Sequence, residues 1–192
     1  MAAKPAPNEK PTDRASFLSD IQSIRKRARE KMEHGAVTPS YGADRKVVLD
    51  LLNEALATEI VCTLRYRRHY FTAEGAVGEA IKQEFMVHAK EEQGHADQIA
   101  ERIVQLGGKP DFNPDSLSRR SHAEYGEGES LSEMLEQDLV AERVAIESYT
   151  EMIAFIGGGD PTTRRMLEEI LAAEEEHAEE MSSMLKHMRR KS

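Results

Sequence analysis

The chain of 192 residues has one cysteine, no tryptophan and no long apolar segment. The single cysteine, Cys62, excludes an intramolecular disulfide and any cysteine-rich zinc or rubredoxin-type site. Apolar residues never continue long enough to form a transmembrane helix. Residues 1–14 also lack the apolar segment of a secretory signal peptide. We therefore expect a cytoplasmic protein without membrane association.

The residues that are abundant favour helices. Ala, Glu, Leu, Met, Arg and Lys are common and runs of β-branched residues are short, which predicts an all-α protein. The formal net charge is −9. This charge argues against a generally basic, nucleic-acid-binding surface and suits a protein that attracts cations.

The N-terminal part of the chain differs from the rest. Residues 1–12 are rich in proline and polar residues, which predicts a disordered tail. Residues 13–34 predict a short amphipathic helix, because apolar residues recur there at helical spacing. These apolar residues are Phe17, Leu18, Ile21 and Ile24. We expect a helical extension over residues 13–43, followed by one domain over residues 44–190.

Four long helices are predicted in that domain. Their ranges are 45–73, 77–106, 131–156 and 161–188. The first and last pairs have short loops, so each pair forms an antiparallel hairpin. The connector of about 22 residues between the second and third helices can reach about 70 Å, whereas a 28-residue helix is about 42 Å long. The connector can cross the whole bundle, which makes the second and third helices parallel.

The second helix of each hairpin carries a Glu-x-x-His motif. These motifs are Glu92-Gln-Gly-His95 and Glu174-Glu-Glu-His177, and each places its two side chains on one helix face. One such match in a Glu-rich helix is weak evidence. Two matches at equivalent places in two hairpins are much stronger evidence for a shared site.

The first helix of each hairpin carries a matching glutamate. Ala57-Thr-Glu59-Ile-Val61 resembles Val140-Ala-Glu142-Arg-Val144, and a tyrosine follows each glutamate at the same spacing, Tyr66 and Tyr149. The chain therefore contains two copies of one unit. Each copy supplies one glutamate and one Glu-x-x-His motif.

The six residues of these two units lie near the midpoints of their predicted helices and have apolar neighbours at helical spacing. We therefore expect one buried layer with four carboxylates and two imidazoles. An unpaired buried charge costs several kcal/mol, whereas two divalent cations would balance four carboxylates. Carboxylate and imidazole ligands suit Fe(II) or Mn(II). A polar layer without metal is the weaker alternative.

At these residues the chain resembles the ferritin superfamily, and most closely bacterioferritins and Dps-like ferritins. The motifs that carry the resemblance are TEIVCTLRY, EEQGHADQIAERI, DLVAERVAIESY and EEILAAEEEHAEEM. The resemblance implies a ferritin-like four-helix bundle with a long crossover and a di-iron ferroxidase centre of two Fe ions. It implies oxidation of Fe(II) by O₂ or H₂O₂ and transfer of Fe(III) to a mineral core inside a homo-oligomeric shell.

The resemblance also assigns roles to residues. The single-helix ligands or bridges would be Glu59 and Glu142. The paired ligands would be Glu92, His95, Glu174 and His177. Tyr66 would be the tyrosine close to the iron, although a purely structural tyrosine is nearly as well supported, and Tyr149 has weaker support.

Two departures from bacterioferritins bear on cofactor and assembly. Gln93 occupies the position of the haem-binding methionine, which argues against haem. The segment after His177 is too short for a fifth helix, which favours a 12-subunit shell over a 24-subunit shell. A rubrerythrin-like di-iron peroxidase and a DNA-protecting Dps-type shell are the alternatives. DNA binding is not favoured, because acidic residues dilute the basic run at residues 25–29.

Two further features have competing interpretations. His88, four residues before Glu92, is either an extra metal or entry ligand or, as we favour, an ordinary polar helix residue. The basic cluster of Arg65, Arg67 and Arg68 is expected at the surface or in a subunit contact.

Overall fold

The computed structural model describes residues 20–191, apart from the side chains of residues 76–78 and 191. It divides between Ser40 and Tyr41 into two compact units, which are described separately. The predicted tail over residues 1–12 and the first part of the predicted N-terminal helix lie outside the described residues.

The N-terminal unit contains less helix than we predicted. Helix α1 spans Ile21–Arg27, and a 3₁₀ helix, η2, spans Met32–His34. A single helix continuing to residue 34 was therefore wrong. Lys31 adopts a left-handed conformation with φ of 50°, which interrupts the helix. Ile21 and Ile24 are exposed, so no buried apolar face stabilises a longer helix.

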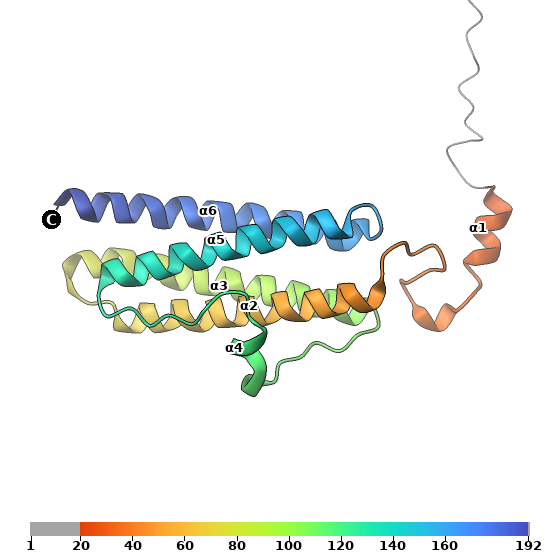
Figure 1. Cartoon of the computed structure of the whole chain (residues 1–192), viewed down its shortest axis with the longest axis horizontal. Helices are drawn as coiled ribbons and strands as arrows, with labels where there is room; N and C mark the ends of the chain where they lie inside the picture. Colours follow the sequence, from red (N-terminus) through yellow and green to blue (C-terminus); the bar gives the residue numbers. More distant parts are fainter. Residues whose placement is uncertain (1–19, 192) are drawn as a thin grey trace, which may run out of the picture. The chain divides into compact units, whose positions relative to one another are not determined.

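The second unit is a bundle of four long helices (Figure 1). Their bounds are α2 Arg45–Thr72, α3 Gly75–Gln105, α5 Leu131–Ile156 and α6 Pro161–Lys191. The ends lie within three residues of the predicted ends, and residues 20–191 contain no strand. The predicted all-α bundle is confirmed. No helix in the described part of the chain combines the length and the apolar character needed to cross a membrane.

Side-chain caps define where three of the helices begin. The Asp44 carboxylate accepts hydrogen bonds from the first-turn amides of α2, and the Ser130 hydroxyl accepts one from the Glu133 amide of α5. The Asp160 carboxylate accepts the Thr163 amide of α6 at 2.9 Å. Each cap satisfies N–H groups that have no partner inside the helix.

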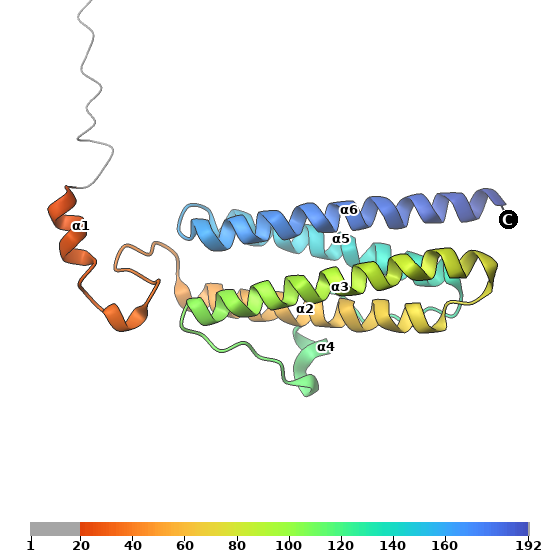
Figure 2. The same cartoon turned by 180° about the vertical axis from the view of Figure 1, so that it is seen from behind.

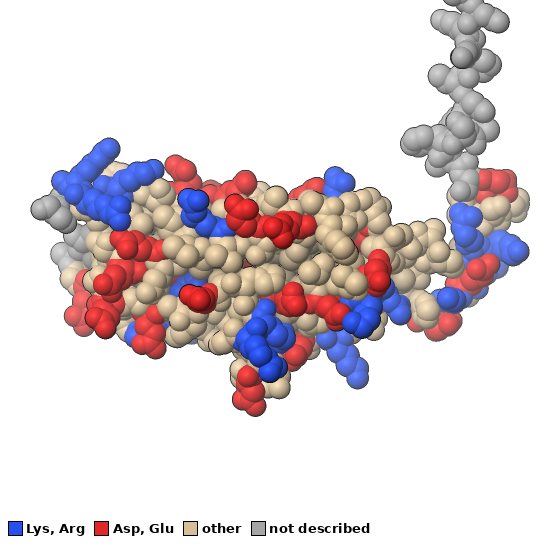
Figure 3. Space-filling view, in the orientation of Figure 1, with Lys and Arg blue, Asp and Glu red and all other residues tan. Residues whose placement is uncertain are grey.

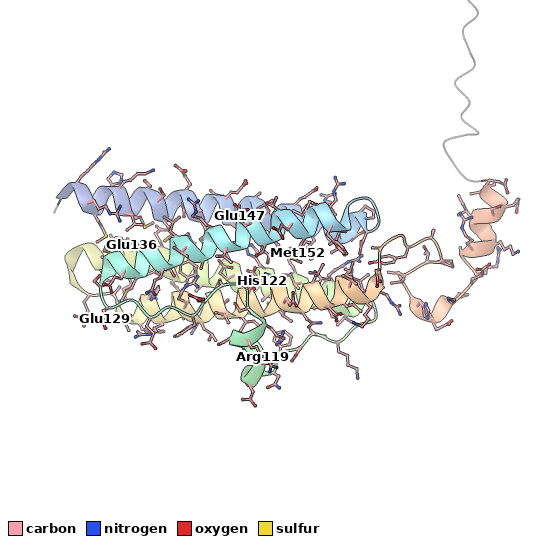
Figure 4. The ribbon with its side chains drawn as sticks, in the orientation of Figure 1. Arg119, His122, Glu129, Glu136, Glu147 and Met152 are labelled. Atoms are coloured by element: carbon pink, nitrogen blue, oxygen red, sulfur yellow. The ribbon has the colours of Figure 1, made fainter. Side chains whose placement is uncertain are left out.

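Two antiparallel hairpins, α2–α3 and α5–α6, form the bundle (Figure 2). The connector between α3 and α5 contains η3 (Pro114–Ser116) and α4 (Leu117–Arg120). It runs back along α2, where the His122 amide donates to Thr58 Oγ1 at 2.9 Å (Figure 4). Helices α3 and α5 therefore run in the same direction, as the length of the connector predicted.

A buried ion pair fixes α2, α5 and the connector to one another. The Arg65 guanidinium is fully buried and donates to Asp138 Oδ1 at 2.8 Å and to the Glu124 carbonyl at 3.2 Å. The His69 ring lies 2.8 Å from Asp138 Oδ2 and 3.1 Å from the Glu127 carbonyl. The predicted surface position of Arg65 was wrong, because Asp138 supplies the opposite charge that burial of a guanidinium requires.

We expect Asp138→Ala to destabilise the bundle strongly. The change leaves the buried Arg65 guanidinium without its carboxylate, a loss of about 3–5 kcal/mol. Denaturant unfolding of the metal-free protein, followed by circular dichroism, measures this loss. The control is Asp50→Ala, which breaks the exposed Lys46–Asp50 pair and should have little effect. Equal unfolding midpoints for the two variants would contradict the role we assign to Asp138.

Candidate metal centre

Six buried side chains from all four long helices meet in the middle of the bundle. They are Glu59 on α2, Glu92 and His95 on α3, Glu142 on α5, and Glu174 and His177 on α6. The six positions singled out in the sequence are thus brought together. Each Glu-x-x-His pair reaches the centre from a single helix face, as its spacing predicts.

The six side chains form two overlapping groups of four. The first contains Glu59, Glu92, His95 and Glu174, and the second contains Glu92, Glu142, Glu174 and His177. Within each group, one nitrogen or oxygen atom from every residue lies within 4.8 Å of the others. Glu92 and Glu174 belong to both groups, which is the arrangement of carboxylates shared between two ions. Glu59 belongs only to the first group and Glu142 only to the second, so each would hold one ion.

The atoms that face the centre have no hydrogen-bond partners. Nine buried side-chain nitrogen and oxygen atoms lack a partner among the described residues, and seven of these belong to the six side chains. Nδ1 of His95 lies 3.0 Å from Glu174 Oε1, and Nδ1 of His177 lies 3.4 Å from Glu92 Oε1. These contacts lack the alignment of hydrogen bonds. Buried polar atoms are almost always satisfied, so this donor set fits two divalent cations.

Two tyrosines hold the Glu142 and Glu59 carboxylates in a reciprocal pattern. The Tyr66 hydroxyl on α2 donates to Glu142 Oε1 on α5, and the Tyr149 hydroxyl on α5 donates to Glu59 Oε1 on α2. Burial and the adjacent carboxylates raise the pKa of both phenols well above 10. Both phenols therefore remain proton donors at neutral pH. Sequence reasoning gave Tyr149 little support, although its place in the internal repeat was the signal for this role.

Two further residues contact the outer side of His177. Its Nε2 lies 2.9 Å from Glu91 Oε2, which leaves Nδ1 directed at the centre. The His88 ring stacks on the His177 ring with a centroid distance of 4.2 Å. Sequence reasoning missed Glu91, because it lies beside Glu92 and off the ligand face. His88 was signalled by its spacing, yet it is buried rather than an ordinary polar residue.

The pKa values of several side chains in the centre are shifted strongly from their ordinary values. Burial, followed by the charge of Glu92, raises the pKa of Glu59 to about 8. Burial and the charge of Glu59 also raise the pKa of Glu174. Burial opposes protonation of His95, but Glu174 and Glu59 outweigh it and raise the pKa of His95 to about 12. Without cations, the centre therefore holds protons at neutral pH, and bound cations must displace them.

The centre can be reached from one side of the bundle. A cavity of about 310 Å³ lies between α3 and α6, the two helices on the near side in Figure 2. His95 and His177 both line it. The cavity therefore brings solvent as far as the two imidazoles of the centre.

Comparisons with known proteins identify the family of this chain. Residues 49–191 match the model of the ferritin-like domain. The chain is similar to a "DNA protection during starvation protein" of Pyrococcus furiosus, with 32% identity over 126 residues, 64% of this chain and 68% of that protein. Other curated relatives are covered over 58 to 65% of their length.

Solved structures similar to this chain are also ferritin-like or bacterioferritin-related proteins. The bacterioferritin-related protein of Bacteroides fragilis, described as a dodecameric thioferritin, is 34% identical with a TM-score of 0.74, over 78% of this chain and 90% of that one. Ferritin-like di-iron-carboxylate proteins of Bacillus anthracis are 30% identical with a TM-score of 0.65, over 73% of this chain and 96% of theirs.

We expect divalent cations to bind more tightly as the pH rises. Glu59, with its pKa of about 8, and the two imidazoles must lose protons before they can bind a cation. Raising the pH removes these competing protons, so affinity for Zn²⁺, a redox-inactive probe, should increase between about pH 6 and pH 8.

Calorimetric titration in two buffers with different ionisation enthalpies measures both the affinity and the protons released. The variant Glu59→Gln should show a smaller pH dependence, because it lacks one of the titrating groups. An affinity that is flat or falls with pH would show that the centre does not release protons on binding.

Proposed function

The chain belongs to the ferritin-like family, and we propose that it is a ferroxidase that binds Fe(II) at the buried centre, oxidises it and stores Fe(III) as a mineral in a homo-oligomeric shell. The observation that carries this proposal is the convergence of seven unsatisfied donor atoms on a site of four carboxylates and two imidazoles. Oxygen and imidazole donors of this kind suit Fe(II).

The residues of the centre have distinct roles in this proposal. Glu92 and Glu174 hold both ferrous ions, so two electrons are available at one place. Two ferrous ions would each give one electron to O₂, which takes up two protons to form H₂O₂, or to H₂O₂, which takes up two protons to form two waters. In both reactions the iron leaves as two ferric ions. Tyr66 and Tyr149 orient Glu142 and Glu59 and keep one oxygen of each carboxylate directed at an ion. The apolar surroundings exclude bulk water from the bound pair.

The charges on the surface support a cation as the substrate. On the face drawn in Figure 3, Lys and Arg side chains gather at the C-terminal end of α6, and over the rest of the helix bundle they are interspersed with Asp and Glu side chains. The net charge of −9 also favours attraction of cations over phosphates. DNA binding therefore stays the less favoured alternative.

Assembly and haem content are parts of the same proposal. We propose a shell of 12 subunits rather than 24, and the dodecameric relative from Bacteroides fragilis supports this size. We also propose that haem is not bound. Gln93 has no thioether that could bind haem iron. Its side chain is exposed, and its amide donates to Asp97 Oδ1 at 3.0 Å.

We expect Glu92→Ala combined with Glu174→Ala to abolish fast Fe(II) oxidation. These changes remove the two carboxylates common to both groups, so neither ion keeps its full set of ligands. Aerobic oxidation is followed by the absorbance of ferric iron in the purified protein. The matched control is Glu101→Ala with Glu175→Ala, which removes two exposed glutamates from the same helices. Fast oxidation that survives in the first double variant would exclude this centre as the ferroxidase.

We expect the oxidised iron to remain in solution with an assembled shell. Size-exclusion chromatography after aerobic loading should show iron co-eluting with a particle of about 12 subunits. Anaerobic addition of H₂O₂ in place of air separates a ferroxidase from a rubrerythrin-like peroxidase. Rapid peroxide turnover by a monomer or dimer, with ferric iron precipitating, would support the peroxidase instead.

A further inference from the structure

The cavity between α3 and α6 has a second group of metal-binding side chains at its edge, outside the six residues of the centre. Glu84 and Glu180 line this cavity, and His88 lies beside them in the bundle. The carboxylate of Glu180 is 43% exposed, whereas the imidazole of His88 is only 1% exposed. The group therefore contains a carboxylate that solvent reaches and, next to it, a buried imidazole nitrogen.

The hydrogen bonds of His88 fix the orientation of its lone pair. Its Nδ1 lies 3.2 Å from the Tyr66 hydroxyl oxygen, and the Tyr66 hydroxyl already donates its only proton to Glu142. Tyr66 must therefore accept from His88, so Nδ1 carries the proton. In the neutral imidazole, this leaves the lone pair of Nε2 facing Glu180 Oε2 at 2.8 Å. Two electron-rich atoms at that distance need a proton or a metal cation between them.

Glu84 completes a set of three donors. One atom each from Glu84, His88 and Glu180 lies within 4.8 Å of the others. Glu84 is half-buried, so the site has one buried nitrogen and two carboxylates open to solvent. One imidazole and two carboxylates are ligands suited to a divalent first-row transition ion.

We propose that Glu84, His88 and Glu180 form a third, mononuclear divalent-cation site at the entrance to the centre. The His88 ring stacks on His177, which contributes to the centre, so the proposed site lies beside the centre. This site has fewer protein ligands than either half of the centre and is more exposed, so it binds its ion more weakly. A weaker site at the entrance can pass its ion inward. That transit role, unlike the site itself, rests on the proposed function.

Anomalous diffraction from crystals grown with Zn²⁺ tests the site directly. In the wild-type protein we expect a peak beside His88 Nε2, in addition to two peaks in the centre. Glu180→Gln should lose the first peak and keep the other two, because the hydrogen bond and ion pair of Glu180 are with His88, which is not one of the six central residues. Glu179→Gln is the matched control, since it removes the same charge from an exposed neighbouring position on α6 and should keep all three peaks.

Equilibrium dialysis with Zn²⁺ provides a second measurement in solution. The bound ions per chain should fall from three to two in Glu180→Gln and remain three in Glu179→Gln. Absence of the His88 peak from wild-type crystals, or its persistence in Glu180→Gln, would overturn the inference and show that His88 and Glu180 form only an ion pair. Empty central positions beside an occupied His88 site would instead overturn the proposed function and leave this site standing.

Discussion

The bundle depends on how four carboxylates are accommodated in its apolar core. Glu59, Glu92, Glu142 and Glu174 are each about 1% exposed, and their charges repel one another. Without cations, proton uptake relieves the repulsion. Burial, followed by the charge of Glu92, raises the pKa of Glu59 to about 8. With two divalent cations, four negative and four positive charges balance. Ions that bind only the folded chain would also stabilise it, so cation binding at this layer would be linked to folding.

Neither hairpin can form half of the centre alone. The first group contains three residues of the α2–α3 hairpin together with Glu174 of α6. The second group contains three residues of the α5–α6 hairpin together with Glu92 of α3. The tyrosines follow the same rule, since each contacts the glutamate of the other hairpin. The internal repeat in the sequence therefore has a physical meaning. Two similar units dock face to face, and each supplies what the other lacks.

Local patterns in the sequence were sufficient to predict most of the fold. Asp44, Ser130 and Asp160 cap helices directly before the predicted first residues 45, 131 and 161, and the length of the connector predicted its crossover. The six residues of the candidate centre could be selected because the sequence gives both their spacing within a helix and their distance from the midpoint of that helix. Their role as metal ligands remains a prediction.

What could not be predicted depends on contacts between distant residues. Arg65 resembles its exposed neighbours in the sequence, and only the fold places Asp138 against it. Glu91 contributes through the outer nitrogen of His177, a contact that no spacing within α3 reveals. The pairing of His88 with Glu180 likewise joins two helices. Spacing within one helix identifies a shared face, but it carries no information about which side chains the next helix brings to that face.

The ion pair of Arg65 also bears on how the centre works. Arg65 and Tyr66 are consecutive on α2, and their partners Asp138 and Glu142 lie one turn apart on α5. The ion pair therefore sets the height at which the Tyr66 phenol meets the Glu142 carboxylate. Because Arg65 and Asp138 need no metal to attract each other, α2 and α5 keep their register whether or not cations are bound. In the proposed function, the centre would bind ferrous ions, oxidise them and release ferric ions repeatedly, and it would gain from such support because its ligands need not be reassembled in each cycle.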